Sequence, residues 1–327
     1  MCTNISIPRK SRSLPLISAR TMDWATKLPT AITFVPRGQS FPELGQRGEI
    51  RWRNRLAFIG AKNSGEFPRF WDGINEAGLS AASLSLFCSI FPEPQANTPL
   101  LSSYNVVSYV LSNFKTIKEV KTALSKLTIV NSYNDAYHYI ISDASGDHLI
   151  IEFINGKMKT YTTTRGVLTN DPPYDWHLTN LSLYEQLSLE DKCNTLCDEE
   201  LGGSGQLGIP GDPTPQSRFI RGALLQQTAF IPNSVQESIG VARQILQTLS
   251  VPNGTVYLRK YKGLYDWTQW GVLRDHTNLS YYFYTDFNSK LYGIHFHELN
   301  LNARNQKQIN IDQPSWYKDI SDRFTSH

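Results

Sequence analysis

A cysteine at the second position, Cys2, is the residue of this chain best suited to nucleophilic chemistry. Removal of Met1 leaves Cys2 with a thiol and an α-amine on one Cα, and the amine has a pKa near about 8 that suits a general base. Because cysteine is small, we expect a methionine aminopeptidase to accept the Met1–Cys2 bond. The same position also fits a small, inert core residue. Position alone therefore leaves both interpretations open.

The other cysteines and the histidines allow a metal-site hypothesis. Cys193 and Cys197 are four residues apart, which suits one helix face, and His295 and His297 alternate along an expected strand. Metal sites normally bring further Cys or His at recognisable spacing, and only His177 lies near the cysteine pair. We therefore favour structural roles for both pairs and expect no metal and no organic cofactor. Four cysteines in 327 residues also argue against a disulfide framework.

Composition and charge favour an ordinary globular protein with neither a membrane nor a nucleic-acid partner. Hydrophobic residues make up 40% and charged residues 19%, and no apolar run approaches the roughly 18 residues that span a bilayer. The formal charge is only +3. Arg51, Arg53 and Arg55 share one face of a strand, which a solvated sheet explains better than a nucleic-acid stripe. Because nothing before Cys2 resembles a targeting segment, we expect a cytoplasmic protein.

Strand and helix signals alternate in blocks along the chain. A helix hairpin follows the first strand block, with Thr116 as the N-cap of its second helix, and Asn155-Gly156 marks a β-hairpin in the second block. We expect strands over 4–8, 16–23, 31–36, 50–60, 138–142, 149–154, 158–163, 166–170, 265–272, 279–286 and 291–297, and a strand region with turns inside it over 73–87. We expect helices over 106–114, from 116 onward, and over 181–189, 218–230 and 234–249.

This order of blocks predicts an α+β fold with layers of sheet and helix. Length alone would allow two domains, yet no Pro/Gly/Ser linker and no repeat divides the chain. The Gly- and Pro-rich loop over 202–215 lacks the spacing of a nucleotide fingerprint, so we expect a flexible or substrate-covering loop there. We therefore predict one domain over residues 2–327, with Met1 removed.

Five blocks of the sequence stand out as a set, in order over nearly the whole chain: Cys2-Thr3, Ala19-Arg20-Thr21-Met22-Asp23-Trp24, Asn75-Glu76-Ala77-Gly78-Leu79, Gly166-Val167-Leu168-Thr169-Asn170-Asp171-Pro172 with Tyr174-Asp175-Trp176-His177, and Pro210-Gly211-Asp212 with Ser217-Arg218-Phe219-Ile220-Arg221. Together they resemble the choloylglycine hydrolase family, which contains the bile salt hydrolases and penicillin V acylases. The resemblance implies an N-terminal-nucleophile hydrolase fold, with two stacked antiparallel sheets between helical layers in the order αββα. It also implies hydrolysis of linear non-peptide amides and assembly into a homotetramer.

The resemblance assigns roles to four polar residues. Arg20 matches the arginine beside the nucleophile, where positive charge stabilises a thiolate, and Asp23 matches the aspartate that holds the freed α-amine. Asn170 matches the oxyanion asparagine, and Arg218 matches the last polar member of the site. Without the resemblance, a surface arginine, two turn residues and a helix cap would be the ordinary explanations. Arg20 and Asp23 are three apart, so contact of both with Cys2 requires a bend or bulge in a regular strand.

Three further positions concern the oxyanion and the substrate. Many bile salt hydrolases carry an asparagine where this chain has Ser85, and we expect the Ser85 backbone N–H to act as the second oxyanion donor. A half-buried strand serine is the plain alternative. Trp24 and Phe87 resemble the aromatic wall of the penicillin V acylase branch, although aromatic residues near a site more often belong to the core.

Together these residues predict a cysteine-dependent hydrolase of linear amides. Cys2 attacks the carbonyl, its amine relays the proton to the leaving amine, and water releases the acyl-enzyme. The expected substrates are phenoxyacetyl penicillins or N-acyl homoserine lactones, with conjugated bile salts as the alternative. A catalytically silent binding protein on the same fold, or a metal-binding protein, would be a function of another class. The expected partners are a small amide substrate and further copies of the chain.

Overall fold

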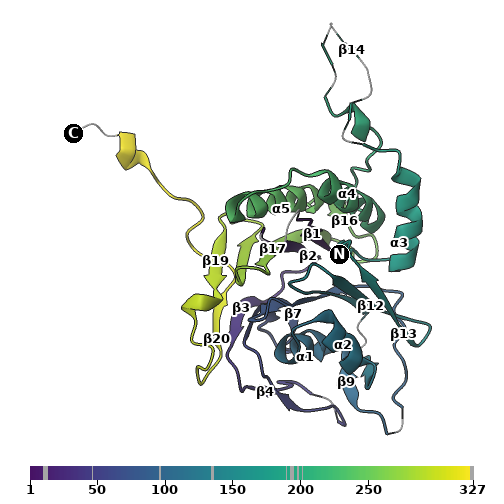
Figure 1. Cartoon of the computed structure of the whole chain (residues 1–327), viewed down its shortest axis with the longest axis vertical. Helices are drawn as coiled ribbons and strands as arrows, with labels where there is room; N and C mark the ends of the chain where they lie inside the picture. Colours follow the sequence, from purple (N-terminus) through teal and green to yellow (C-terminus); the bar gives the residue numbers. More distant parts are fainter. Residues whose placement is uncertain are drawn as a thin grey trace.

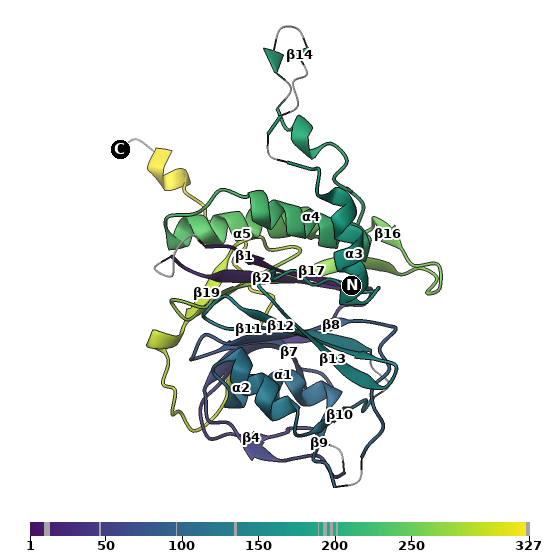
Figure 2. The ribbon, with the colours of Figure 1, turned by 45° about the vertical axis from the view of Figure 1, so that its right-hand side comes forward.

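Two large antiparallel sheets lie face to face between two helical layers (Figure 1, Figure 2). Figure 2 shows the order of the layers, from α4 and α5 through the first sheet and the second sheet to α1 and α2. This arrangement confirms the predicted α+β class and the αββα order of layers. The structure is a computed structural model, and it describes residues 1–9, 14–45, 47–95, 97–133, 136–188, 190–191, 195–196, 199–200 and 202–324.

Each sheet is assembled from distant parts of the chain. In spatial order the first sheet contains β1 (Cys2–Ile7), β2 (Ile17–Trp24), β17 (Tyr265–Asp275), β18 (Ser280–Thr285) and β19 (Tyr292–His295), and β16 (Val256–Tyr257) also pairs with β17. The second sheet contains β13 (Lys157–Thr163), β12 (His148–Ile154), β11 (Tyr137–Ser142), β8 (Ser80–Ser85), β7 (Phe70–Asn75), β6 (Phe58–Asn63), β3 (Thr30–Val35) and β20 (Lys307–Asn310).

The helical layers and several short elements complete the fold. The helices are α1 (Val106–Asn113), α2 (Ile117–Leu124), α3 (Tyr174–Leu181), α4 (Pro215–Thr228) and α5 (Val235–Leu249). Short strand pairs are β4 (Ser40–Phe41) with β5 (Trp52–Arg53), β9 (Leu100–Ser102) with β10 (Thr128–Val130), and β14 (Thr195–Leu196) with β15 (Glu199–Glu200). Among the described residues, no helix combines the length and the apolar character that a membrane crossing needs.

Strands in the middle of the layers are buried on both faces. Every residue of β1, β7 and β8 is buried, so the polar residues of β1 face a packed layer as the apolar ones do. Asn4 illustrates how such a polar side chain is satisfied: its Nδ2 donates to Gly166 O at 3.1 Å and its Oδ1 accepts from Arg274 Nη2 at 2.6 Å. The alternation at the start of the chain therefore separates two interior faces of the molecule.

The helix start predicted by the capping residue Thr116 is confirmed. Thr116 Oγ1 accepts from Glu119 N at 3.3 Å, and the Glu119 carboxylate accepts from Lys115 N, as in a capping box. Thr214 caps α4 ahead of Pro215, and Ser234 caps α5. The predicted helices over 218–230 and 234–249 are thus present, with α4 starting three residues earlier.

The predicted helix over 181–189 is wrong, because the helix lies earlier, as α3. Its first turn is stabilised from outside the segment: Glu152 of β12 accepts a hydrogen bond from Tyr174 N through both carboxylate oxygens, at 3.0 and 3.1 Å. This distant carboxylate satisfies an N–H that the helix itself leaves free. A 3₁₀ turn over Ser182–Tyr184 follows α3.

Two predicted strands are also wrong in extent. Residues 166–170 form no strand and contribute only a single bridge, between Leu168 and Asn4. The predicted strand over 50–60 is split into β5 and β6, because Asn54 folds the chain between them: its side chain accepts from Gln39 N and donates to Leu56 O. Local side-chain hydrogen bonds outcompete the ladder there.

A buried histidine, His276, links the two sheets. Its Nδ1 lies 2.7 Å from Gly78 O, in the turn between β7 and β8, and its Nε2 lies 2.7 Å from Ser18 Oγ of β2. Because a carbonyl only accepts, Nδ1 carries the proton and Nε2 accepts from the serine. Gly78 has φ +78°, and a Cβ there would lie 2.6 Å from His276 O. The neutral ring is therefore fully satisfied in a tight interior site.

We expect His276 to make stability depend on pH in mildly acidic solution. Burial lowers the pKa of His276 from 6.5 to about 3, so the unfolded chain binds this proton and the folded chain does not. The contribution is complete above pH 6.5 and declines as pH falls from there toward the folded value, by about 2 kcal/mol at pH 5. Denaturant unfolding at pH 7 and pH 5 measures it. His276→Gln should flatten this part of the profile, and an unchanged slope would contradict the assignment.

Candidate active site

Cys2 lies at the start of β1, buried, with its thiol on the face that meets the second sheet. The antiparallel register pairs Cys2 with Met22 and Asn4 with Arg20, which puts these side chains on one face of the first sheet. Cys2 Sγ is 3.6 Å from Arg20 Nη2 and 3.6 Å from Met22 Sδ. The structure thus brings the predicted nucleophile and its predicted arginine together.

The guanidinium of Arg20 is fully buried and held by several groups. Nη1 donates to Trp71 O at 2.6 Å and Nη2 donates to Ser83 O at 2.7 Å. The Asp72 carboxylate lies 3.7 Å from Nη1, and the guanidinium carbon is 5.5 Å from the centre of the Trp270 ring. Backbone carbonyls of the second sheet therefore fix a positive charge of the first sheet next to the thiol.

Asp23 lies on the opposite face of β2 from Arg20, toward the helical layer. Its Oδ1 accepts from Thr268 Oγ1 at 2.6 Å, and its Oδ2 lies 3.9 Å from Arg218 Nη1. Among the described residues Oδ2 has no hydrogen-bond donor. Burial raises the pKa of Asp23, and the charge of Arg218 opposes that rise.

The bend expected between Arg20 and Asp23 does not occur. β2 runs without interruption from Ile17 to Trp24, and the register shift falls instead in its partner β17, between Thr268 and Trp270. Arg20 approaches the thiol from one face of the sheet while Asp23 stays on the other. The N-terminal end of β1 pairs with this part of β2, so Arg20 and Asp23 lie near the first residues of the chain on opposite faces of the sheet. β2 stays regular.

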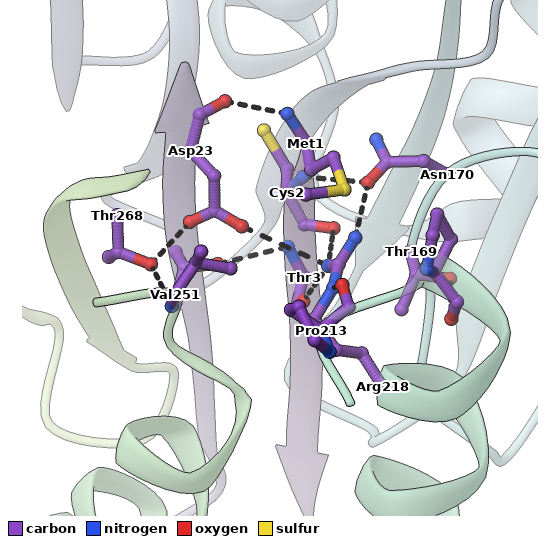
Figure 3. Close-up of polar contacts among 12 residues, drawn as sticks. Met1, Cys2, Thr3, Asp23, Thr169, Asn170, Pro213, Arg218, Val251 and Thr268 are labelled. Carbon is purple, nitrogen blue, oxygen red and sulfur yellow. Dashed lines mark hydrogen bonds and ion pairs between the residues drawn. The ribbon is translucent and has the colours of Figure 1, made fainter. Parts of the chain in front are cut away.

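Asn170 and Arg218 converge on the backbone of Cys2 (Figure 3). Cys2 N donates to Asn170 Oδ1 at 2.7 Å, and Arg218 Nη2 donates to the same oxygen at 2.9 Å. Arg218 Nη1 also donates to Cys2 O at 2.7 Å. Spacing alone did not choose between Arg218 and Arg221; Arg221 donates to Thr248 O, away from the thiol. Burial lowers the pKa of Arg218, and its charge is balanced by Asp23.

Met1 occupies the space beyond Cys2 in this chain. Its amino group donates to Asp23 O at 2.8 Å and pairs with Asp266 Oδ2 at 3.2 Å, so Cys2 N is here a peptide N–H. The hydrogen bond of that N–H to Asn170 shows where an α-amine on Cys2 would lie. No motif or spacing in the sequence pointed to Asp266.

Ser85 is oriented by its contact with Asn170. Asn170 Nδ2 donates to Ser85 O at 2.8 Å, and the next residue, Leu86, donates its N–H to Ala136 O on the β11 side. In an antiparallel strand the N–H and C=O of one residue point the same way, and they alternate along the strand. The Ser85 N–H therefore points away from β11, toward the side where Asn170 lies.

A small cavity of about 40 Å³ adjoins the Cys2 thiol, and the two predicted substrate-binding residues differ in their position relative to this cavity. Trp24 lines it, whereas Phe87 lies beyond the end of β8, is 69% exposed and donates its N–H to Asp171. A larger groove of about 1000 Å³ lies along α1 and α2, and none of the predicted site residues line it, so chemistry rather than size identifies the site. The lining residues are Cys2, Arg20, Met22, Trp24, Leu28, Arg69, Trp71, Ser83, Ser85 and Tyr137.

A buried network that sequence reasoning missed fixes the backbone around Asn170. His177 Nε2 lies 2.9 Å from Asn170 O, and His138 Nε2 lies 3.0 Å from Thr169 O. His138 Nδ1 is 3.0 Å from the Glu152 carboxylate that also caps α3. Only His177 had a signal, as part of the Tyr174-Asp175-Trp176-His177 block. Burial lowers its pKa to about 4, so the ring is neutral near pH 7 and donates to the carbonyl.

The metal-site hypothesis gains no support from the described part of the chain. Across those residues no group of three or more His, Cys, Asp or Glu is placed to hold a metal ion. His295 Nδ1 lies 2.8 Å from Ser280 Oγ, and His297 lies in a 3₁₀ turn beside Glu298. Cys193 and Cys197 lie outside the described residues.

Comparison with known proteins agrees with this geometry. The family model for linear amide C–N hydrolases of the choloylglycine hydrolase family matches residues 2–309. The bile salt hydrolase/transferase of Clostridium perfringens is 31% identical over 94% of this chain and 96% of its own length. The penicillin V acylase of Pectobacterium atrosepticum is 27% identical over 90% of this chain and 81% of its own length.

The solved structures give the same relationship. A variant of the conjugated bile acid hydrolase from Clostridium perfringens superposes with a TM-score of 0.82 at 27% identity, covering 95% of this chain and 97% of that chain. The described architecture is therefore the N-terminal-nucleophile hydrolase fold that the sequence blocks implied.

Proposed function

Because the chain belongs to the choloylglycine hydrolase family of linear amide C–N hydrolases, we propose that Cys2, once Met1 is removed, is its catalytic nucleophile. The observation that carries this proposal is the contact of Cys2 Sγ with Arg20 Nη2 at 3.6 Å, beside a cavity in an otherwise packed interior. A thiolate there is stabilised by a guanidinium that cannot move away, because two carbonyls hold it.

The proposed reaction has two steps that share one base. The thiolate attacks the amide carbonyl, the C–N bond breaks, and the α-ammonium of Cys2 gives its proton to the leaving nitrogen, which leaves a thioester on Sγ. Water then attacks the thioester while the α-amine takes up one of its protons, so the C–S bond breaks and the free acid, the Cys2 thiolate and the α-ammonium are formed. Asp23, with one carboxylate oxygen lacking a hydrogen-bond donor among the described residues, is suited to accept from the freed amine.

Two donors are available for the oxyanion of each step. We propose that the Ser85 backbone N–H and the side-chain amide of Asn170 donate hydrogen bonds to this oxyanion. One hydrogen of Asn170 Nδ2 is used by Ser85 O, and the second remains for the substrate oxygen. Loss of one such donor typically costs about 3 kcal/mol of transition-state stabilisation. A serine at position 85 keeps this role because only its backbone is needed.

The aromatic and aliphatic lining of the cavity favours an apolar acyl group. Trp24 and Trp71 line it together with Leu28 and Met22, and an aromatic acyl ring packs well against such walls. We therefore propose a penicillin V acylase-like or N-acyl homoserine lactone acylase-like activity. Conjugated bile salts are the second candidate, favoured by the 31% identity to a bile salt hydrolase/transferase. Phe87 enters only as a candidate contact outside the cavity.

A comparison of kcat/KM tests this substrate assignment. We expect the protein lacking Met1 to hydrolyse penicillin V or a C8 to C12 acyl homoserine lactone at least about tenfold more efficiently than a glycine-conjugated bile salt, a difference of about 1.4 kcal/mol in transition-state binding. Preference for the bile salt would reverse the order of the candidates. Binding of all three amides without product would instead establish a catalytically silent binding protein.

Assembly and location are proposed on the resemblance alone. Related proteins are often homotetramers, and we propose a homo-oligomer, with a tetramer as the expected state and the cytoplasm as its location. Light scattering of the purified chain measures the oligomeric state, and fractionation of the source cells measures the location.

A further inference from the structure

A buried cluster of charges lies behind Arg20, on the side away from the substrate cavity. Asp72 of β7 stands between two guanidinium groups: its Oδ2 is 3.7 Å from Arg20 Nη1 and 3.3 Å from Arg274 Nη1. Tyr281 of β18 donates its hydroxyl to Asp72 Oδ1 at 3.0 Å. The side chains of all four residues are at most 1% exposed. The cluster therefore joins the two sheets in the buried interior.

The charges of this cluster do not balance. Arg20 and Arg274 contribute two positive charges and Asp72 one negative charge, so one positive charge remains. Burial raises the pKa of Tyr281 well above its ordinary value, so its hydroxyl stays neutral. Arg274 Nη2 donates to the neutral Asn4 side chain, and among the described residues no second carboxylate pairs with Arg274. A buried, uncompensated charge is costly. A negative charge on Cys2 Sγ, 3.6 Å from Arg20, would complete the balance.

We propose that Arg274 and Asp72 are positioning residues that set the ionisation of Cys2 through Arg20, with Arg274 promoting the thiolate and Asp72 opposing it. This inference deepens the nucleophilic role of Cys2 and rests on it. Neither residue lines the cavity, so neither touches the substrate. Arg20 keeps its place without Asp72, because its two hydrogen bonds to Trp71 O and Ser83 O remain.

The other charged or titratable groups around Cys2 are the same in every variant of the test. They come from both sheets and from the helical layer, so the shift between variants reports the changed residue alone. These groups are Asp23 of β2, Arg69 just before β7, Tyr137 of β11, Asp266 of β17, Arg218 of α4 and the α-amine of Cys2.

The pH dependence of thiol alkylation tests the proposal without any substrate turnover. Iodoacetamide labelling of the N-terminal peptide is followed by mass across pH, which separates Cys2 from exposed Cys88. Asp72→Asn should move the midpoint of labelling to lower pH by about one unit, and Arg274→Gln should move it higher by about one unit. Arg274→Lys, which keeps the charge, should restore most of the wild-type midpoint.

Tyr281→Phe is the matched control, because it removes a hydrogen bond to Asp72 without changing any charge. Its midpoint should stay close to the wild type. Shifts of Asp72→Asn and Arg274→Gln in the same direction, or no shift in either, would overturn the proposal. If Arg274→Gln does not fold, the difference in labelling midpoint between Asp72→Asn and Tyr281→Phe decides by itself whether the proposal holds. Opposite shifts in a protein that hydrolyses no amide would uphold the cluster and refute the proposed function.

Discussion

Cys2→Ala should lower kcat/KM for amide hydrolysis by on the order of 10⁴-fold or more while leaving the fold intact. Alanine removes the thiol on which the proposed thioester forms. The β1–β2 pairing persists because the backbone carries it. Cys2→Ser should lose nearly as much activity, since a hydroxyl beside Arg20 does not ionise as a thiol does. Steady-state assays together with circular dichroism measure both effects.

Cys88→Ala is the matched control for this prediction. Cys88 is a free cysteine whose side chain is exposed overall. Partial burial of its thiol, together with the charge of Asp171, raises its pKa to about 12. A thiol with that pKa stays protonated at neutral pH and is a poor nucleophile, so its loss should leave hydrolysis unchanged. Substantial turnover by Cys2→Ala would refute covalent catalysis by this residue.

Retention of Met1 should abolish hydrolysis as completely as Cys2→Ala. With Met1 attached, Cys2 N is a peptide N–H that already donates to Asn170 Oδ1, and it has no basic lone pair for proton transfer. The Met1 amine cannot take its place, since it pairs with Asp266 and Asp23 O. A chain fused at its N-terminus to a segment whose proteolysis leaves Cys2 first provides the measurement.

We expect no turnover from the uncleaved fusion and full turnover after cleavage. The same fusion carrying Cys2→Ala, cleaved in parallel, controls for the protease treatment and should stay inactive. Full activity before cleavage would mean that the α-amine of Cys2 is not the base, whatever the role of the thiol.

Local signals along the chain predicted the elements that position the site. The N-cap threonine of α2 and the Asn155-Gly156 turn each act within a few residues, and the structure has both features where they were expected. The start of α3 was missed because its first turn is stabilised by Glu152, a strand residue 22 positions earlier. No pattern within 174–181 encodes that contact.

Some residues of the site were likewise predictable from the sequence, and others were not. Arg20 and Asn170 were selected through resemblance to a family, and the structure places both beside Cys2. Asp72 and Arg274 carry no motif; they meet Arg20 only because two sheets stack, which joins positions that are 202 residues apart in sequence. Electrostatic partners of this kind follow from tertiary packing, and sequence spacing does not reveal them.

The mass of the N-terminal peptide during turnover reveals whether Cys2 carries the acyl group. The protein is mixed with penicillin V, quenched in acid within the first turnovers and digested. We expect a peptide that begins at Cys2, lacks Met1 and carries one phenoxyacetyl group as a thioester, and we expect no such peptide from Cys2→Ala. Turnover by protein whose N-terminal peptide keeps Met1, or an acyl group bound at any other residue, would contradict nucleophilic catalysis by an N-terminal Cys2.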